Sequence, residues 1–321
     1  MRKFFIIVLI VIIPTVLFCQ EELLEKPDGY FSNATLKIAY FFGTLDLIEK
    51  MPPVPDDLIE YKDIVYRKVQ DRSLKLDIYH TKELKEERPV LIFIHGGAWK
   101  KGDKVDYRRY LVDYAKKGYV TVTVQYSLSK IAKFPAAVSD IKCAIEWIKN
   151  NSEKYFIDPN KIALIGGSAG GHLSMMVGYS DYASYNECID SNGTNKVQAI
   201  VNLYGPADLT TEYARSQSSV EYFLGKKYKE DNDIFNAASP VSYLTKDDPP
   251  TLIFQGTLDE LVPYTQADSL ISKLDRVGIP AEYHKLEGWP HTMDLGVEVN
   301  EYCQYYMDRF FEKYIPFKKE N

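Results

Sequence analysis

Short apolar segments, each separated from the next by a stretch long enough for a helix, constrain the fold of this chain most strongly. Residues 89–95, 119–124, 161–167, 197–203, 250–256 and 281–286 predict strands. Helices are predicted over residues 107–117, 136–149, 264–277 and 298–314. Neighbouring parallel strands need long crossovers, which are usually helical. The pattern predicts an α/β fold with a mostly parallel central sheet and helices on both faces.

Two segments before this alternation have a different pattern. Residues 64–69 and 74–79 alternate apolar and polar side chains with a period near two, and residues 70–73 separate them. This spacing is typical of a β-hairpin. An antiparallel pair is therefore expected at the N-terminal edge of the sheet.

The first residues resemble a secretory signal. Arg2 and Lys3 precede an uncharged run over residues 4–18, which at 15 residues is short for the roughly 20 needed to cross a bilayer. Residues 1–19 are predicted to be a signal peptide, so the protein is expected to be exported, to a periplasm or outside the cell. Contact with a membrane is expected only if Cys19 is lipidated or the signal stays uncleaved.

Residues 20–57 are predicted to form a leader, with a short amphipathic helix and then a proline-rich connector at 51–55. Residues 58–321 are predicted to form one α/β domain, interrupted at about 206–248 by a partly helical insertion. The sequence leaves open whether the leader or the insertion covers the site.

Three cysteines follow the predicted signal, namely Cys143, Cys188 and Cys303, so at most one disulfide can form among them. Cys143 lies in an amphipathic helical pattern, where a buried free thiol is expected. The formal charge of −6 comes without any long basic run, which argues against nucleic acid as a partner. No cysteine or histidine spacing indicates a metal.

The sequence Gly166-Gly167-Ser168-Ala169-Gly170 lies between a predicted strand and a predicted helix. Such a junction makes a sharp turn that exposes the serine hydroxyl at the end of the sheet, and small flanking residues allow the close backbone packing it needs. Ser168 is therefore the candidate nucleophile. The N–H of Ala169, in the first helical turn, would face a developing negative charge.

An acidic residue and a histidine follow later predicted strands. In a parallel sheet the loops after the strands meet at one edge, so Asp259 and His291 are expected near Ser168. His291 would take the serine proton, and Asp259 would orient the imidazole. Glu260 and His284 are the competing residues, but Asp259 comes three residues after a glycine turn and His284 falls within a predicted strand.

A fourth loop, His95-Gly96-Gly97-Ala98-Trp99, follows an early buried strand. Paired glycines let backbone N–H groups turn toward an oxyanion, so Gly97 and Ala98 are expected to join Ala169 in that role. His95 is expected to hold the loop by a hydrogen bond, and Trp99 to line the site or anchor the loop. His172 is expected to pack the helix after Ser168.

These motifs together resemble the esterase branch of the α/β-hydrolase superfamily, near its hormone-sensitive-lipase-like, acetyl-xylan or feruloyl esterase-like and kynurenine-formamidase-like members. The similarity runs from about residue 61 to the C-terminus and includes Phe134-Pro135-Ala136-Ala137-Val138 and Ala238-Ser239-Pro240. It implies hydrolysis of a carboxylic ester through an acyl-enzyme without a cofactor. The substrate would be a small ester or one linked to polysaccharide, with a short acyl, acetyl or feruloyl group.

Two departures favour the esterase and formamidase members over the hormone-sensitive-lipase-like ones, which commonly have Tyr-Arg-Leu where Tyr126-Ser127-Leu128 stands and a third glycine where Ala98 stands. Two alternatives to an esterase remain. One is an amide hydrolase of the same fold, either a formamidase or a peptidase of the prolyl-oligopeptidase type. The other is a non-catalytic binding protein.

Overall fold

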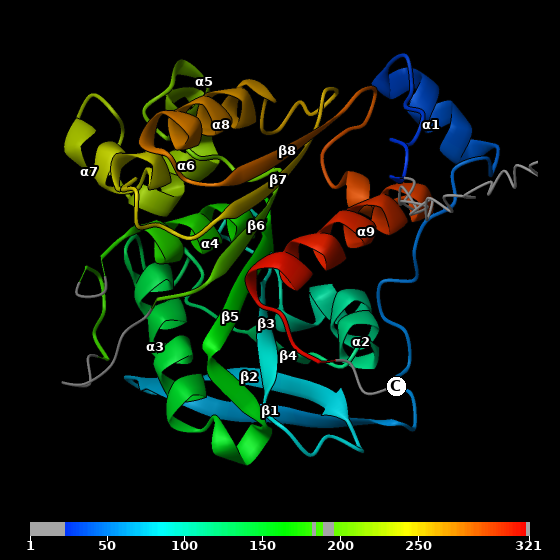
Figure 1. The fold of residues 1–321 in the computed structure, drawn as a ribbon. Coiled ribbons are helices and arrows are strands. Elements are labelled where there is room, and N and C mark those ends of the chain that lie inside the picture. The colour runs from blue at the N-terminus through cyan, green and yellow to red at the C-terminus, as the bar shows by residue number, and fades with distance from the viewer. Residues whose placement is uncertain (1–22, 182–183, 189–195, 319–321) are drawn as a thin grey trace, which may run out of the picture.

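The computed structural model of the chain describes residues 23–181, 184–188 and 196–318. The predicted signal over residues 1–19, with Cys19, lies outside them. One eight-stranded sheet runs through the molecule in the order β1-β2-β4-β3-β5-β6-β7-β8 (Figure 1). β1 pairs with β2 and β2 with β4 antiparallel, and every other neighbouring pair is parallel. The predicted mostly parallel sheet with an antiparallel N-terminal pair is confirmed.

The strands lie close to their predicted positions. The largest difference is in the hairpin, where β1 begins six residues earlier than the predicted strand because its first half also pairs with β2. The bounds are β1 Leu58–Val69, β2 Arg72–Thr81, β3 Arg88–Ile94, β4 Val120–Val124, β5 Ile157–Gly167, β6 Ala199–Leu203, β7 Thr251–Gly256 and β8 Ala281–Leu286.

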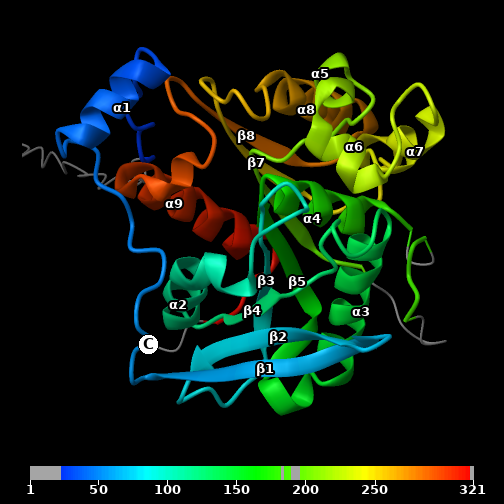
Figure 2. The same cartoon turned by 180° about the vertical axis from the view of Figure 1, so that it is seen from behind.

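Helices cover both faces of the sheet, as Figure 1 and the reverse view in Figure 2 show. α2 (Arg108–Lys116) and α9 (Val297–Tyr314) pack on one face around a core that includes Phe93 and Phe311. α3 (Ala136–Asn150), α4 (Ala169–Tyr179) and α8 (Thr265–Val277) pack on the other, around Ile92 and Leu173. β3 and β7 have buried side chains on both faces, which explains their continuous apolar sequences.

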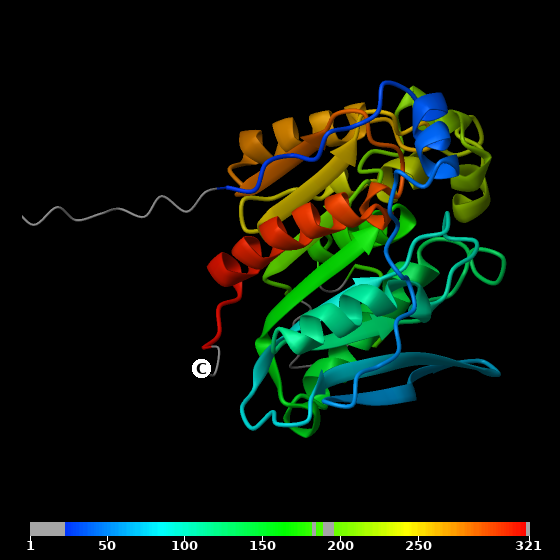
Figure 3. The same cartoon turned by 90° about the vertical axis from the view of Figure 1, so that its right-hand side faces the viewer.

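The leader begins with α1 (Asn33–Phe41), which Ser32 and Thr35 cap reciprocally and which has no buried residue. The chain then runs along one edge of the molecule, past the start of α9 and past α2, before it enters β1 (Figure 3). Backbone hydrogen bonds fix this path: the N–H of Ile48 donates to the carbonyl of Leu295 (2.9 Å), and the N–H of Val297 donates to that of Asp46 (2.9 Å).

The insertion between β6 and β7 is helical in part, as predicted. It contains three short α-helices, α5 (Glu212–Ser216), α6 (Ser218–Leu224) and α7 (Asn232–Ala237), followed by a 3₁₀ turn at Pro240–Ser242. In the views of Figures 1 and 2 these helices lie near α8. In the part of the chain that the structure describes, no helix has both the length and the apolar character that crossing a membrane requires.

The expectation of a free thiol at Cys143 is wrong. Cys143 on α3 forms a disulfide with Cys188, 45 residues later in the chain. The amphipathic pattern of α3 correctly indicated burial, but the partner lies in the polar stretch after α4, and its position depends on tertiary contacts that periodicity does not encode. Cys303 is free and buried in α9.

Candidate active site

Ser168 stands at the turn between β5 and α4 with a backbone φ of 56°. A non-glycine residue with positive φ is uncommon, and the turn persists because its neighbours leave no room for another path. A Cβ at Gly170 would lie 1.9 Å from the carbonyl oxygen of Ile94 on β3. The glycine thus lets α4 approach the sheet, and Ser168 is partly exposed at the strand end, where it lines a cavity.

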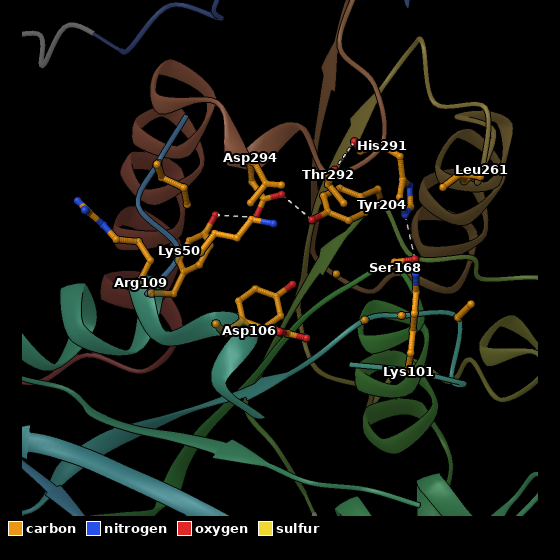
Figure 4. A pocket seen from close by; sticks show the side chains of 18 residues that line it. Lys50, Lys101, Asp106, Arg109, Ser168, Tyr204, Leu261, His291, Thr292 and Asp294 are labelled. Carbon is orange, nitrogen blue, oxygen red and sulfur yellow. Dashed lines mark hydrogen bonds between the residues drawn. The ribbon is translucent and has the colours of Figure 1, made fainter. Parts of the chain in front are cut away.

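His291, in the loop after β8, meets Ser168 at the predicted edge of the sheet. Its Nε2 lies 2.9 Å from the Ser168 Oγ, and its Nδ1 lies 2.7 Å from Oδ2 of Asp259. The three predicted side chains therefore form one continuous hydrogen-bonded series (Figure 4 shows Ser168 and His291). His284 is distant from this series, since it lies on β8 and its Nδ1 contacts the hydroxyl of Tyr302 at 2.8 Å.

The Asp259 carboxylate is fully buried and accepts hydrogen bonds at both oxygens. The N–H groups of Leu261 and Val262 donate to Oδ1 at 2.9 and 2.8 Å, and the amide of Gln255 donates to Oδ2 at 2.9 Å. These donors aim Oδ2 at His291 and stabilise its charge. Glu260, the competing acid, points away and accepts from Asn33 of the leader.

The predicted oxyanion donors lie in two loops and line the same two pockets as Ser168. Gly97 and Ala98 have positive φ values of 103° and 54°, and Ala169 is the first residue of α4. Their three N–H groups donate to no other residue in the described ranges. Unused donors beside the candidate nucleophile can bind a developing oxyanion, which is their predicted role.

The other residues singled out in these loops have structural contacts. His95 is buried with Nδ1 2.9 Å from the Gly96 carbonyl, and it stacks on Tyr126. Trp99 is also buried: its indole N–H donates to Nδ1 of His172 at 3.2 Å, and its ring stacks on Phe223 of the insertion. The expected roles of His95 in holding the loop and of Trp99 in anchoring it agree with these contacts.

His172 is completely buried on α4, in agreement with the expected packing role. Its Nε2 lies 2.8 Å from the carbonyl of Ala238, so Nε2 carries the proton and Nδ1 accepts from Trp99. Burial lowers the pKa of His172 to about 4, because no charged group compensates the loss of water. The side chain therefore stays neutral and holds the loop after β3 against α4.

A cavity of about 550 Å³ opens beside Ser168 and His291 (Figure 4). Several residues of its wall were not predicted from the sequence. They are Ile48 and Lys50 from the leader, Asp106 and Tyr107 from the turn between β3 and α2, Arg109 and Tyr110 from α2, Tyr204 after β6, and Asp294. Tyr204 could have been found, since it directly follows a predicted strand. Lys50 and Asp294 depend on how the leader and the loop after His291 pack.

Asp294 and Tyr204 form a buried polar pair next to His291. The Tyr204 hydroxyl donates to Oδ1 of Asp294, and the Tyr110 hydroxyl donates to Oδ2 at 3.1 Å. Burial raises the pKa of Asp294 above its usual range, although both phenol hydrogen bonds oppose the shift. The Tyr204 ring packs edge-on against the His291 ring, with centroids 4.7 Å apart. The pair thus supports one side of the imidazole.

A second, smaller pocket of about 100 Å³ adjoins Ser168 on the side of the insertion. Ala98, Trp99 and Ala169 line it together with Tyr213 and Val220 of the insertion. His291 lines only the large cavity. Ser168 therefore stands between two spaces of unequal size, and both the leader and the insertion contribute to the walls around it.

The sequence profile of the BD-FAE family matches residues 76–274, which is 199 of the 321 residues. The chain belongs to the BD-FAE family. The matched range of this BD-FAE member includes Ser168 and Asp259 and ends before His291.

Relatives and solved structures agree with the family and the fold. Esterase LipC of Mycobacterium tuberculosis is 31% identical over 259 residues, which cover 77% of this chain and 64% of LipC, less than two thirds of that protein. An esterase from Thermogutta terrifontis with bound propionate superposes with a TM-score of 0.71 at 24% identity, covering 85% of this chain and all of that one. A truncated carbohydrate esterase from gut microbiota gives 0.68 at 25% identity, covering 83% and 98%. The fold is that of the α/β-hydrolases.

Proposed function

We propose that this chain is an exported serine carboxylesterase that hydrolyses short-acyl esters through an acyl-enzyme. The observation that carries the proposal is the hydrogen-bonded series from Asp259 through His291 to Ser168. Three backbone N–H groups without an acceptor among the described residues belong to residues that line the same pockets as Ser168. Those are the parts that serine acyl transfer requires. The esterase names of the relatives support the same reaction.

In the proposed reaction, the Ser168 Oγ attacks the ester carbonyl carbon while His291 Nε2 takes the hydroxyl proton. The carbonyl electrons move to its oxygen, and the N–H groups of Gly97, Ala98 and Ala169 bind that oxyanion. When the intermediate collapses, the bond to the alcohol oxygen breaks and His291 returns the proton to that oxygen. A water molecule then repeats the sequence on the acyl-enzyme, which releases the acid and restores Ser168.

The two pockets support an assignment of the two halves of the substrate. The leaving alcohol must lie on the side of the group that protonates it, and His291 lines only the large cavity. The alcohol therefore occupies the cavity of about 550 Å³, and the acyl group occupies the pocket of about 100 Å³. The small size of that pocket favours an acetyl or similarly short group over a feruloyl group.

An alcohol portion that belongs to a polysaccharide fits this assignment. The large cavity has several hydroxyl-bearing or charged walls, among them Tyr107, Asp106 and Lys101. Aromatic faces with polar edges suit the mixed surface of a sugar ring. The carbohydrate esterase that shares the fold at 25% identity supports the same substrate class.

Export is supported by two independent observations. The charged start and the apolar run over residues 4–18 have the composition of a secretory signal. The disulfide between Cys143 and Cys188 suits an oxidising compartment, since disulfides are rare in the cytosol.

The reaction is tested with p-nitrophenyl esters of increasing acyl length. We expect the wild-type protein to release p-nitrophenol fastest from the acetate, and Ser168→Ala to reduce kcat by about 10⁴-fold or more while the protein remains folded. Unchanged turnover in Ser168→Ala would overturn the proposed nucleophile. A faster rate on N-formylkynurenine or a dipeptidyl anilide than on the acetate would favour an amide hydrolase instead.

A further inference from the structure

The leader holds one cationic side chain at the wall of the large cavity. Its backbone is fixed on both sides: Ile48 bonds to Leu295 in the loop after His291, and the N–H of Arg109 on α2 donates to the carbonyl of Lys50 at 3.2 Å. Figure 4 shows the Lys50 side chain reaching toward Asp294, across the cavity from Ser168. The position of Lys50 is therefore set by α2 and by the segment that follows His291.

Within the described ranges, Lys50 forms no ion pair with an acidic side chain. Four other charged side chains line the cavity, namely Lys101, Asp106, Arg109 and Asp294. Arg109 is paired with Asp113 at 2.8 Å, and Figure 4 shows it directed away from the cavity. Both oxygens of Asp294 accept from phenols. Asp106 caps its own turn by accepting from the N–H of Asp103 at 3.0 Å.

Lys101 is the second lysine of the cavity and likewise forms no ion pair with the described residues. It lies on the Ser168 side, whereas Lys50 lies on the opposite side (Figure 4). Both lysines are exposed to solvent at the rim of the cavity, so the attraction of either for an anion weakens as the salt concentration rises. An anion at Lys50 would lie far from the reacting carbonyl, within the space that the proposed reaction gives to the alcohol.

We infer that Lys50, which the leader holds across the cavity from Ser168, binds a carboxylate on the alcohol part of the substrate. The preferred esters are then those of acidic alcohols, such as the hydroxyl groups of sugars that carry a uronic acid. This inference rests on the proposed esterase function and makes Lys50 a specificity-determining residue for it.

Two acetate esters of phenols test the inference, one with a carboxylate and one with a methyl group at the para position. For 4-acetoxybenzoate and 4-methylphenyl acetate, kcat/KM is measured for wild type, Lys50→Gln, Lys50→Arg and Lys101→Gln. Lys68→Gln is the matched control, since Lys68 is exposed on β1 and its loss changes the net charge equally. Each variant is compared with wild type on the same ester, so the different reactivity of the two phenols cancels.

We expect Lys50→Gln to lower kcat/KM for 4-acetoxybenzoate about fivefold to tenfold, mainly through KM, and to leave 4-methylphenyl acetate within about twofold. Lys50→Arg should retain the preference, and Lys68→Gln should match wild type. Raising the salt concentration should increase KM for the charged ester only. Equal effects of Lys50→Gln on both esters, or a loss of the preference in Lys101→Gln alone, would overturn the inference.

Binding gives a measurement that does not depend on turnover. In Ser168→Ala, 4-hydroxybenzoate should bind more tightly than 4-methylphenol by calorimetry, and adding Lys50→Gln should remove the difference. If this difference is found but neither ester is hydrolysed, the proposed reaction fails and the anion site stands. If both esters are hydrolysed but the difference is absent, the reaction stands and the anion site fails.

Discussion

The strand-end loops that carry Ser168, Asp259 and the oxyanion donors differ from the leader in how they are held. Of the strands that precede those loops, β3 and β7 are buried along their whole length and β5 is buried over residues 162–167, so their positions follow from packing on both faces of the sheet. The leader has a helix with no buried residue and is held by hydrogen bonds at a few points. The comparison indicates that the sheet positions the candidate catalytic residues, whereas the leader lines the large cavity that the proposed reaction assigns to the alcohol.

The largest expected effect concerns Asp259 in the sheet-borne region. Asp259→Asn keeps the shape of the side chain but removes the charge that stabilises the His291 cation, so kcat/KM for p-nitrophenyl acetate should fall by about 10²–10⁴-fold. Glu260→Gln is the matched control because Glu260 contacts Asn33 of the leader, and it should stay within about twofold of wild type. A similar loss of kcat/KM in Glu260→Gln would show that the contact with the leader matters as much to the reaction as the Asp259 charge.

A pair of glycine substitutions compares the two regions directly. A Cβ at Gly170 would lie 1.9 Å from the backbone oxygen of Ile94, and one at Gly29 would lie 1.8 Å from that of Glu287. Gly170→Ala should reduce the free energy of unfolding by about 3 kcal/mol or more, since neither backbone can move easily. Gly29→Ala should cost about 1 kcal/mol or less, because the leader can shift outward.

Urea unfolding of both glycine variants measures these costs, and limited proteolysis should find faster cleavage within residues 23–50 of Gly29→Ala. An equally large loss of stability at Gly29 would mean that the leader unfolds together with the sheet as part of the same core.

The pH dependence of stability should also originate in the sheet-borne region, since all five histidines lie beyond residue 57. Burial lowers the pKa of His172 to about 4 in the folded state, against about 6.5 when unfolded. Between these values the unfolded chain binds a proton that the folded chain does not. Stability is therefore complete above about pH 6.5 and decreases as the pH falls toward 4, by about 3 kcal/mol from this group.

Unfolding in urea at pH 4, 5, 6 and 7 measures this decrease. His172→Gln, whose amide can still contact Trp99 and Ala238, should have a shallower slope than wild type. His284→Gln is the matched comparison, because burial also lowers the pKa of His284 to about 4. A slope unchanged by His172→Gln would show that the buried imidazole does not control stability in this range.

The smallest expected effect concerns Asn33 of the leader. Its amide donates to Glu260 at 2.8 Å and to the carbonyl of Leu258 at 3.3 Å, which ties α1 to the loop that carries Asp259. Asn33→Ala should lower kcat/KM for p-nitrophenyl acetate by no more than about twofold, since exposed hydrogen bonds contribute little. A tenfold loss would place the leader among the elements on which the chemistry depends.

The same difference explains what the sequence could predict. Apolar periodicity identified all eight strands and, through the strand-end rule, brought Ser168, Asp259 and His291 to one edge. It could not reveal Cys188 as the partner of Cys143, because that contact joins a helix to an irregular stretch. It also could not place Lys50 at the cavity, since backbone hydrogen bonds between the leader and Leu295 fix it there. Backbone contacts of this kind leave no residue pattern.

The central claim is that Ser168 is the nucleophile, activated by His291. Its most direct test is peptide mapping by mass spectrometry after reaction with a fluorophosphonate. The account predicts one adduct on the Ser168 Oγ in the wild-type protein, no adduct in Ser168→Ala, and labelling slowed by at least about a hundredfold in His291→Ala. An adduct on a different residue, or equally fast labelling without His291, would contradict it.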